Sequence, residues 1–263
     1  MGQLEGKVAV VLGAAGKDNM GQTIARRFAR EGAKVVVAGR KEEPLKALAA
    51  EIGGTWVLCD ITRKADIEAM AKKALDSYGK VDVAVNATGW GLLVPLLETT
   101  EEQMDAIYAL QFKGPHFFFQ VFTEAMTHGG SVIQITSATT DRVIDNHAAY
   151  IGTKAGADAL VRCFANEFGA RGIKFNSIAP GITDSPMTEQ AMATPGLLET
   201  FVKEYPLGRI GTSDDIADAA VWLAGDGSFI TGQVLHVNGG LTLRRNPTGA
   251  EMGAAIAAAS AKA

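Results

Sequence analysis

Short apolar segments alternate with amphipathic segments along most of the chain. The apolar segments are rich in Val and Ile on both faces, which is typical of strands in a parallel sheet that helices cover on both sides. This pattern predicts strands at 7–12, 34–39, 55–60, 81–86, 131–136, 173–180 and 233–240.

Helical periods fill the intervals between these strands. They predict helices at 22–32, ending at Gly32 as a C-cap, at 42–54, and at 62–79 with Thr62 as an N-cap, and longer helices at 100–127 and 148–170. The regular alternation predicts an α/β fold, a single doubly wound Rossmann-type domain with a seven-stranded parallel sheet flanked by helices.

Two regions depart from this alternation. Residues 181–212 are rich in Pro and Gly, and so long a connection inside a compact domain is typical of a functional lid. The Ala-rich tail follows Pro247 and is compatible with either a docked helix or a disordered end. We therefore expect one cofactor-binding and catalytic domain over 1–245 and a tail over 246–263.

Composition narrows the function classes. The chain has 263 residues, 47% of them hydrophobic, and a formal net charge of −4, so neither nucleic acid nor an anionic membrane is an expected partner. Cys59 and Cys163 lie in apolar stretches, which favours buried free thiols over a disulfide. No signal peptide, membrane span or metal site is predicted, and we expect a cytoplasmic protein.

The stretch "GAAGKDNMG" at 13–21 joins the first predicted strand to the first helix. Backbone N–H groups at a helix N-terminus attract phosphate, and glycine allows its close approach, so this position favours a nucleotide-binding loop over a structural turn without a ligand. Asp18 is unfavourable beside an anion, and we expect it to point away or to cap the helix.

The residues after the second strand indicate which nucleotide binds. They are Arg40 and Lys41, where an acidic residue would accept a hydrogen bond from a ribose 2′-hydroxyl. A guanidinium is suited to a 2′-phosphate, and Lys17 adds a second positive charge, so the sequence favours NADP(H) over NAD(H). Asp60 could accept from an adenine amino group or cap the next helix.

Candidate chemistry follows the fifth strand. Tyr150 and Lys154 are four residues apart on a predicted helix and share a face. A nearby ammonium favours the phenolate, so we expect it to lower the pKa of the phenol and let it exchange a proton with a carbonyl or alcohol oxygen. Ser137, at a strand end, could hydrogen-bond the same oxygen.

These residues, taken with their surroundings, resemble the short-chain dehydrogenase/reductase family from about residue 4 to about residue 243. The resemblance is carried by the glycine loop at 13–21, "CDIT" at 59–62, "VNATG" at 85–89, Ser137, "YIGTK" at 150–154, "NSIAPGITDSPM" at 176–187, "PLGRIGTSDDIA" at 206–217 and "ITGQVLHVNGG" at 230–240.

The resemblance implies roles for the matching positions. Tyr150 would be the general acid/base, Lys154 would lower its pKa and bind the nicotinamide ribose, and Ser137 would orient the substrate oxygen. Ile182 and Thr183 would contact the nicotinamide amide. The full set of expected cofactor contacts is Gly13, Gly16, Lys17, Asn19, Met20, Gly21, Arg40, Asp60, Ile61, Asn86, Ala87, Gly89, Tyr150, Lys154, Pro180, Gly181, Ile182 and Thr183.

Relatives are commonly tetramers packed through two long helices and the last strand, which implies a homotetramer, with a homodimer as the alternative.

Two positions differ from the family pattern. Asn19 stands where the second glycine of the loop would align, with two residues inserted, and Asn tolerates a positive φ better than most residues. Gln111 stands where the family carries an asparagine linked to a water-mediated proton path behind the lysine. We include Gln111 among the catalytic candidates, with its path either kept in shifted geometry or weakened.

The candidate substrate contacts are mostly apolar, which favours a hydrophobic ketone or secondary alcohol, including 3-oxoacyl, cyclic or steroid-like compounds. They are Trp90, Leu92, Ala138, Thr139, Ile144, His147, Thr183 and Met187. His147 could donate to the substrate or simply begin the helix. The sequence predicts an NADP(H)-dependent carbonyl reductase or alcohol dehydrogenase. The alternatives are a weakly catalytic NADP(H)-binding sensor or scaffold, and an enzyme that reduces an imine or enone.

Overall fold

The computed structural model describes residues 2–186 and 188–261. Its main sheet has seven parallel strands in the order β3-β2-β1-β4-β5-β6-β9. The strands are β1 (Val8–Leu12), β2 (Lys34–Gly39), β3 (Thr55–Leu58), β4 (Val83–Asn86), β5 (Gly130–Ile135), β6 (Ile173–Pro180) and β9 (Val234–Val237). The predicted doubly wound sheet is therefore confirmed, with strand ends within a few residues of the expected ones.

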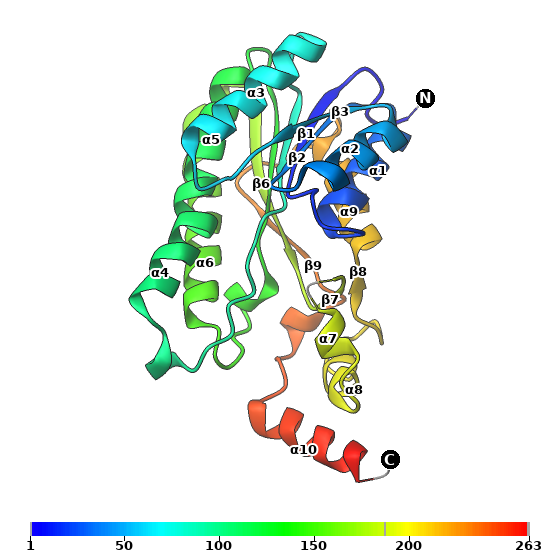
Figure 1. The fold of residues 1–263 in the computed structure, drawn as a ribbon, viewed down its shortest axis with the longest axis vertical. Coiled ribbons are helices and arrows are strands. Elements are labelled where there is room, and N and C mark those ends of the chain that lie inside the picture. Colours follow the sequence, from blue (N-terminus) through cyan, green and yellow to red (C-terminus); the bar gives the residue numbers. More distant parts are fainter. Residues whose placement is uncertain (1, 187, 262–263) are drawn as a thin grey trace.

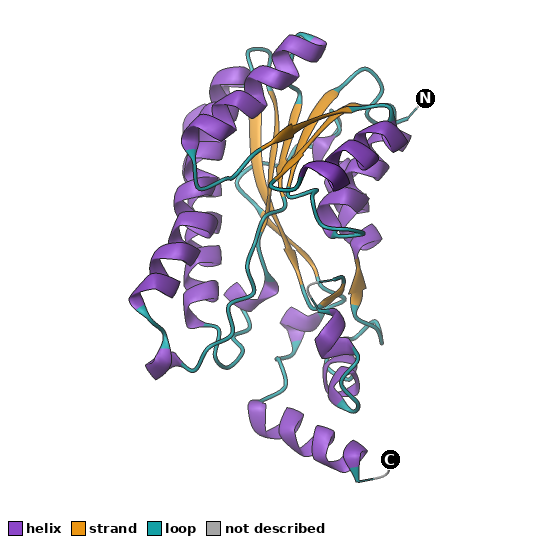
Figure 2. Cartoon of the chain, viewed as in Figure 1, coloured by secondary structure: helices purple, strands orange, loops and turns teal. Residues whose placement is uncertain are grey.

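Helices cover both faces of this sheet (Figures 1 and 2). The helices are α1 (Met20–Arg30), α2 (Glu42–Ile52), α3 (Lys64–Tyr78), α4 (Glu101–Tyr108), α5 (Gly114–Ala125), α6 (Ala148–Phe168), α7 (Glu189–Met192), α8 (Leu197–Val202), α9 (Ser213–Ala224) and α10 (Gly249–Ser260). Helices α1, α2 and α9 lie on one face, and α3, α5 and α6 lie on the other. None of the helices in 2–186 and 188–261 is long and apolar enough to cross a bilayer.

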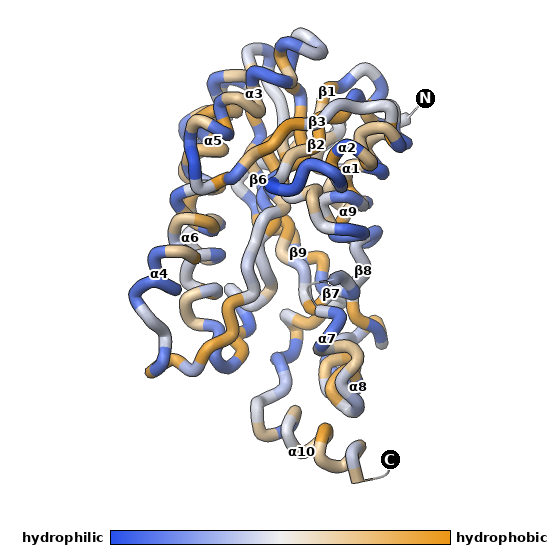
Figure 3. The backbone as a smooth tube through the Cα atoms, viewed as in Figure 1, coloured by the Kyte–Doolittle hydropathy of each residue, from blue (hydrophilic) through white to orange (hydrophobic). Residues whose placement is uncertain are grey.

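Each face of the sheet has its own apolar core. Val11 and Val37 point toward α1 and α9 and meet Phe28, whereas Val10 and Val36 belong to the core under α3 and α5. This division follows from the alternation of side chains along each strand. Figure 3 shows the resulting hydrophobic colour along the strands at the centre of the molecule.

Several local expectations need correction. Thr62 is not the N-cap of α3; that position is Arg63, and the Thr62 hydroxyl instead donates to Asp60 Oδ1 at 2.8 Å. Both cysteines are free, as predicted, but Cys163 is exposed because it lies on the outer face of α6. Glu31 is the C-cap of α1, and Gly32 follows it with a φ of +94°, so the glycine does end this helix.

The helix predicted at 100–127 is divided into three parts. A π-helical turn (Ala109–Lys113) separates α4 from α5 and contains Gln111. Such turns insert an extra residue into a helix and redirect its side chains, often at functional sites.

The segment 181–212 contains α7, α8 and a small parallel pair, β7 (Thr183–Asp184) with β8 (Gly211–Thr212). The tail forms α10, which begins at a Thr248–Glu251 capping box and contacts α8 (Figure 1). The Gly249 N–H also donates to Asp145 Oδ2 at 3.0 Å, so the tail is tied to the loop that precedes α6.

Candidate active site

The candidate site lies at the carboxyl ends of the central strands. The strand order reverses between β1 and β4, and open parallel sheets bind ligands in the crevice outside such a reversal. Gly13 follows β1, Asn86 ends β4 and Ser137 follows β5, so the fold brings the three candidate segments to one edge of the sheet.

Close backbone contacts explain two glycines of the loop at 13–21. Gly13 has a φ of +100°, and a Cβ there would lie 2.8 Å from the Ala87 carbonyl oxygen. A Cβ on Gly21 would lie 2.6 Å from the Gly13 oxygen. Both positions therefore exclude larger residues, and the loop passes directly against β4.

Asn19 has a different role from the one expected. Its φ is −79°, and the residue with positive φ is Asp18, at +51°. Asn19 is the N-cap of α1: its Oδ1 accepts from Gln22 N–H at 3.0 Å, and its Nδ2 donates to the Gly13 oxygen at 2.8 Å. Asp18 does not cap the helix, and its carboxylate lies 3.6 Å from Arg26.

The loop suits a pyrophosphate in its backbone geometry and charge. It opens directly onto the N-terminus of α1, whose first turn begins at Met20 and contains no acidic residue. Gly16 is partly exposed and Lys17 is exposed, so a phosphate group could approach both. The residues present thus fit the pyrophosphate of a dinucleotide.

Replacing Gly13 with Ala is expected to lower the free energy of unfolding by about 1–3 kcal/mol, because the residue is held at positive φ against the Ala87 carbonyl. Gly53→Ala is the matched control, since Gly53 also has a positive φ, +63°, but has nothing within 4 Å of an added Cβ. Urea denaturation of both variants would measure the difference, and equal losses would contradict the close-contact argument.

Arg40 and Asp60 follow neighbouring strands and flank the adenosine end of the predicted site. The pKa of Asp60 is lowered: burial acts against the lowering, hydrogen bonds from the Thr62 N–H and hydroxyl outweigh it, and the charges of Arg40 and Arg63 add to their effect. The Arg40 side chain itself is exposed. Asp60 thus closes its own turn and does not cap α3, and the next residue, Ile61, is buried.

The segment after β4 is fixed by buried polar contacts. Asn86 is fully buried; its Nδ2 donates to Gln134 Oε1 at 2.9 Å, and its Oδ1 accepts from Thr88 N–H at 3.1 Å. A Cβ on Gly89 would lie 3.4 Å from Lys154 Nζ. Ala87 and Gly89 therefore line the path from the glycine loop to Lys154.

A tyrosine that the sequence reasoning did not identify lies behind the expected nicotinamide segment. Its hydroxyl, Tyr205 Oη, accepts from Ile182 N–H at 2.6 Å, and a Cβ on Gly181 would lie 2.4 Å from that oxygen. Burial raises the pKa of Tyr205 to about 12. The backbone N–H of Ile182, a residue expected beside the nicotinamide amide, donates to Tyr205 in this structure. Pro180 ends β6, and Thr183 Oγ1 donates to the Gly181 oxygen at 3.0 Å.

Lys154 is buried, with 3% of its surface exposed. Its Nζ donates to the Ile135 oxygen at 2.9 Å and to the Thr88 oxygen at 3.4 Å, and it lies 5.8 Å from the centre of the Tyr150 ring. Burial lowers the pKa of Lys154 to about 8, while the charge of Asp158 opposes that change.

The expected lowering of the Tyr150 pKa by Lys154 is wrong for this structure. Burial is the main influence and raises the pKa of Tyr150, and the interaction that opposes it is with the Ser137 hydroxyl. Tyr150 and Lys154 do share a face of α6, as predicted, and on that face the Lys154 ammonium lies near the Tyr150 ring. The raised pKa of Tyr150 favours the protonated phenol, which is the form that can donate a proton.

Ser137 is positioned to donate toward Tyr150. Its Oγ accepts hydrogen bonds from Thr139 N–H at 3.2 Å and from the Thr139 hydroxyl at 2.9 Å. With its lone pairs engaged, the Ser137 proton can point toward the Tyr150 oxygen or toward a substrate oxygen.

Gln111 connects the site to α6. Its Oε1 accepts from Trp90 N–H at 2.8 Å, and its Nε2 donates to Thr153 Oγ1 at 3.0 Å. Thr153, which sequence reasoning also did not identify, immediately precedes Lys154. The amide of Gln111 thus holds the segment after β4 against the helix that carries Tyr150 and Lys154.

The candidate substrate residues differ in how far they are exposed. Ala138 and Leu92 are buried, Thr139, Ile144 and His147 are half-buried, and Trp90 is 38% exposed. The His147 ring stands edge-on to Tyr150, with centroids 5.4 Å apart. Ala138 packs in one apolar cluster with Phe201 of α8 and Met252 of α10, so the segment 181–212 and the tail reach the same region. Met187 lies outside the described residues.

Comparison with known proteins identifies the family. Residues 13–242 match the family described as enoyl-(acyl carrier protein) reductase. The chain is a member of the short-chain dehydrogenase/reductase family. It is 31% identical to D-threitol dehydrogenase from Mycolicibacterium smegmatis over 92% of this chain and 95% of that protein. It is 32% identical to NAD-dependent glycerol dehydrogenase from Listeria innocua over 90% of this chain and 94% of that protein.

A solved structure shows the same family fold. A short-chain type dehydrogenase/reductase from Mycobacterium ulcerans superimposes with a TM-score of 0.88 at 26% identity, covering 93% of this chain and 92% of the other. The present protein is accordingly an oxidoreductase of alcohols or ketones that uses a nicotinamide cofactor and a small-molecule substrate.

Proposed function

We propose that this protein is an NADP(H)-dependent carbonyl reductase, reversible as an alcohol dehydrogenase, that acts on a hydrophobic ketone or secondary alcohol. The observation that carries the proposal is the gathering of Ser137, Tyr150 and Lys154 at the carboxyl end of β5. Ser137 follows that strand, and Lys154 Nζ donates to the Ile135 oxygen at the strand end and lies 5.8 Å from the centre of the Tyr150 ring. The bound cofactor would supply the hydride.

Each of these side chains has a separate task in the proposed reaction. Ser137 holds the carbonyl oxygen by donating a hydrogen bond, and Tyr150 donates its phenolic proton to that oxygen as charge develops on it. The Lys154 ammonium, 5.8 Å from the centre of the Tyr150 ring, would bind the nicotinamide ribose. For alcohol oxidation the proton moves in the opposite direction, from the alcohol to Tyr150.

The surroundings of the site support a hydrophobic substrate. Leu93 and Leu97 are 62% and 101% exposed, and Val143 is 72% exposed in the loop before α6. The Val94 N–H donates to the Asn146 oxygen at 2.9 Å, which joins these two segments beside His147. Figure 3 shows the hydrophobic stretch that precedes α4. These apolar side chains would receive the non-reacting part of the substrate.

The proposal can be tested by following the absorbance of the reduced nicotinamide. The assay would use a panel of ketones and secondary alcohols, each with NADPH, NADP⁺, NADH and NAD⁺. We expect turnover of apolar cyclic or long-chain members, with NADPH preferred. Cofactor binding without turnover of any member would favour a sensor or scaffold instead, and product analysis would separate carbonyl reduction from reduction of an imine or enone.

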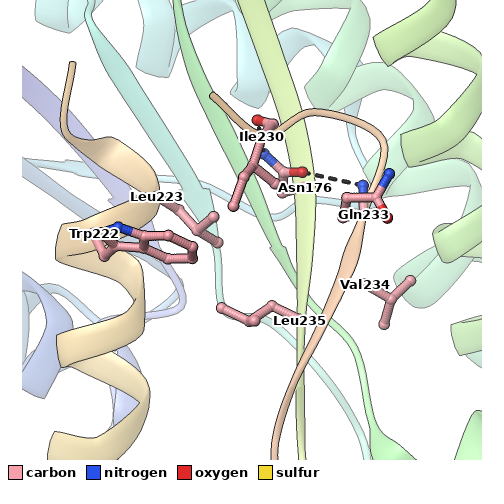
Figure 4. Close-up of a pocket in the computed structure, with 7 residues that line it drawn as sticks. All are labelled: Asn176, Trp222, Leu223, Ile230, Gln233, Val234 and Leu235. Atoms are coloured by element: carbon pink, nitrogen blue, oxygen red, sulfur yellow. Dashed lines mark hydrogen bonds between the residues drawn. The ribbon is translucent and has the colours of Figure 1, made fainter. Parts of the chain in front are cut away.

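We also propose a homotetramer. Strand β9 is an edge of the sheet with all four residues half-exposed, and α9 beside it exposes 47% of Trp222. Exposed sheet edges are usually covered. Between them lies a hollow of 270 Å³ (Figure 4), lined by Asn176, Trp222, Leu223, Ile230, Gln233, Val234 and Leu235.

Analytical ultracentrifugation is expected to give the mass of four 27.6 kDa chains. Trp222→Glu should place a charge in the proposed interface and yield smaller species, because an unpaired buried charge is strongly unfavourable. Leu75→Glu, at a 38% exposed position on α3, is the control and should remain tetrameric. A native protein that sediments as a monomer would contradict this proposal.

A further inference from the structure

The C-terminal tail is a part of the chain that the proposed reaction leaves without a task. It lies beyond residues 13–242, which match the family, and it consists of α10 and the connection that leads to it. No residue of α10 is fully buried, so this helix adds little to the apolar core of the molecule. Its contacts are instead with segments that carry candidate substrate residues.

The connection to α10 is tied to the loop at 141–147, which precedes α6. Asn246 is buried, and its Nδ2 donates to the Arg142 oxygen at 2.5 Å and to the Val143 oxygen at 3.4 Å. In the opposite direction, Arg142 Nε donates to the Arg244 oxygen at 2.9 Å. Because a buried amide needs partners for its N–H groups, these bonds fix the 141–147 loop against the tail.

Helix α10 is also held against α8. Gly196, the N-cap of α8, has a φ of +79°, and a Cβ there would lie 2.5 Å from the Ala255 oxygen. The half-buried residues of α10 recur every three or four positions and so form one face. They are Glu251, Met252, Ala255, Ile256 and Ala259.

Met252, on this face, connects the tail to the candidate substrate residues. It packs in one apolar cluster with Ala138, Ile144 and Phe201, and it is the only member of that cluster among the described residues of the tail. Ala138 and Ile144 are both candidate substrate contacts. An unbranched thioether fills irregular space between other side chains, so Met252 is suited to support a wall formed by its neighbours.

We propose that Met252 is a specificity-determining residue: its side chain supports the wall that receives the non-reacting group of the substrate, and Asn246 holds that wall in place. This inference rests on the proposed function, because it assigns the size limit of the same substrate site. A shorter side chain at Met252 leaves space behind Ile144, so the wall can recede and a larger group can enter. A tail that only stabilised the fold would not change which substrate is preferred.

The ketones acetophenone and acetonaphthone, which differ by one fused ring, measure this size limit. In Met252→Ala the ratio of kcat/KM for acetonaphthone to that for acetophenone is expected to rise by about 10-fold, since apolar pockets discriminate by about 10–200-fold per methylene group. The change should come mainly from the KM of the larger ketone, because the reacting groups are untouched. An unchanged ratio overturns the proposal.

Met252→Phe makes the opposite change and should lower the same ratio, because a larger side chain pushes the wall toward the substrate. Ile256→Ala is the matched control: Ile256 lies one turn further along the same face of α10 but outside the cluster that contains Ile144. It should leave the ratio unchanged. Equal shifts of the ratio in Met252→Ala and Ile256→Ala would show a general effect of the tail and overturn the assignment to Met252.

Hydrogen–deuterium exchange tests the role of Asn246 without any substrate. Asn246→Ala removes both bonds to the 141–147 loop, whose Asp141 and Arg142 N–H groups donate to the Ala138 oxygen at 3.1 and 3.0 Å. These two amides should exchange about 10-fold faster in the variant, the effect of losing roughly one hydrogen bond of local stability. The amides of α2 serve as an internal reference, and unchanged exchange in the loop contradicts the role of Asn246.

The measurements separate this inference from the proposed function. If turnover is present and the ratio does not move in Met252→Ala, only the present inference fails. If the native protein turns over neither ketone, the dissociation constants of both ketones for the native protein and Met252→Ala, measured with NADPH present, decide the size limit in the same way. Absence of turnover with the whole panel would refute the proposed function alone.

Discussion

Replacing Tyr150 with Phe is expected to reduce turnover by about 10²–10⁴-fold, the usual contribution of a positioned general acid. The variant keeps the ring that stands against His147 and Lys154 and removes only the hydroxyl that interacts with Ser137. Steady-state kinetics with the best substrate of the panel would measure the loss, and fluorescence titration should give a near-native cofactor affinity.

Tyr108→Phe is the control for that experiment, because Tyr108 is 48% exposed on α4 and lies outside the candidate site. It should keep full activity. Retained turnover in Tyr150→Phe would show that another group supplies the proton, whereas loss of cofactor binding would indicate that the substitution disturbs the nicotinamide site.

Replacing Arg40 with Asp is expected to raise the KM for NADPH by about 10–100-fold, the equivalent of one or two charge-assisted hydrogen bonds. The exposed guanidinium follows β2 beside Asp60, where a 2′-phosphate would lie. The KM for NADH should change little or fall, since a carboxylate at this position can accept from the ribose hydroxyls.

The control for Arg40→Asp is Arg30→Asp, which makes the same change of charge at an exposed position on α1. Initial rates over a range of each cofactor would compare the two variants. An equal increase in KM for NADPH and NADH in Arg40→Asp would contradict the phosphate role, and a similar increase in Arg30→Asp would indicate a general effect of net charge.

The sheet was predictable because strands buried on both faces leave continuous apolar runs in the sequence, such as Val8–Leu12 and Lys34–Gly39. The placement of Ser137 near Tyr150 could also be predicted from the sequence, because strand ends and helical spacing position side chains before any packing is known. These features depend on local periodicity, which a single sequence records.

Other features of the site depend on tertiary contacts that no local pattern specifies. Asn19 suits both a positive φ and an N-cap, and the contact with Gly13 decides between them. The spacing of Tyr150 and Lys154 gives their shared face, but the burial that raises the pKa of Tyr150 comes from packing around the helix. Tyr205 lies 23 residues from its partner Ile182, a distance in sequence at which no motif pairs them.

The Tyr205 hydrogen bond also ties two separate parts of the chain together. Tyr205 lies three residues after the end of α8 and accepts from Ile182, which follows β6. A displacement of α8 that carried Tyr205 with it would break this bond, so the backbone just beyond β6 depends for its anchorage on a single phenol oxygen.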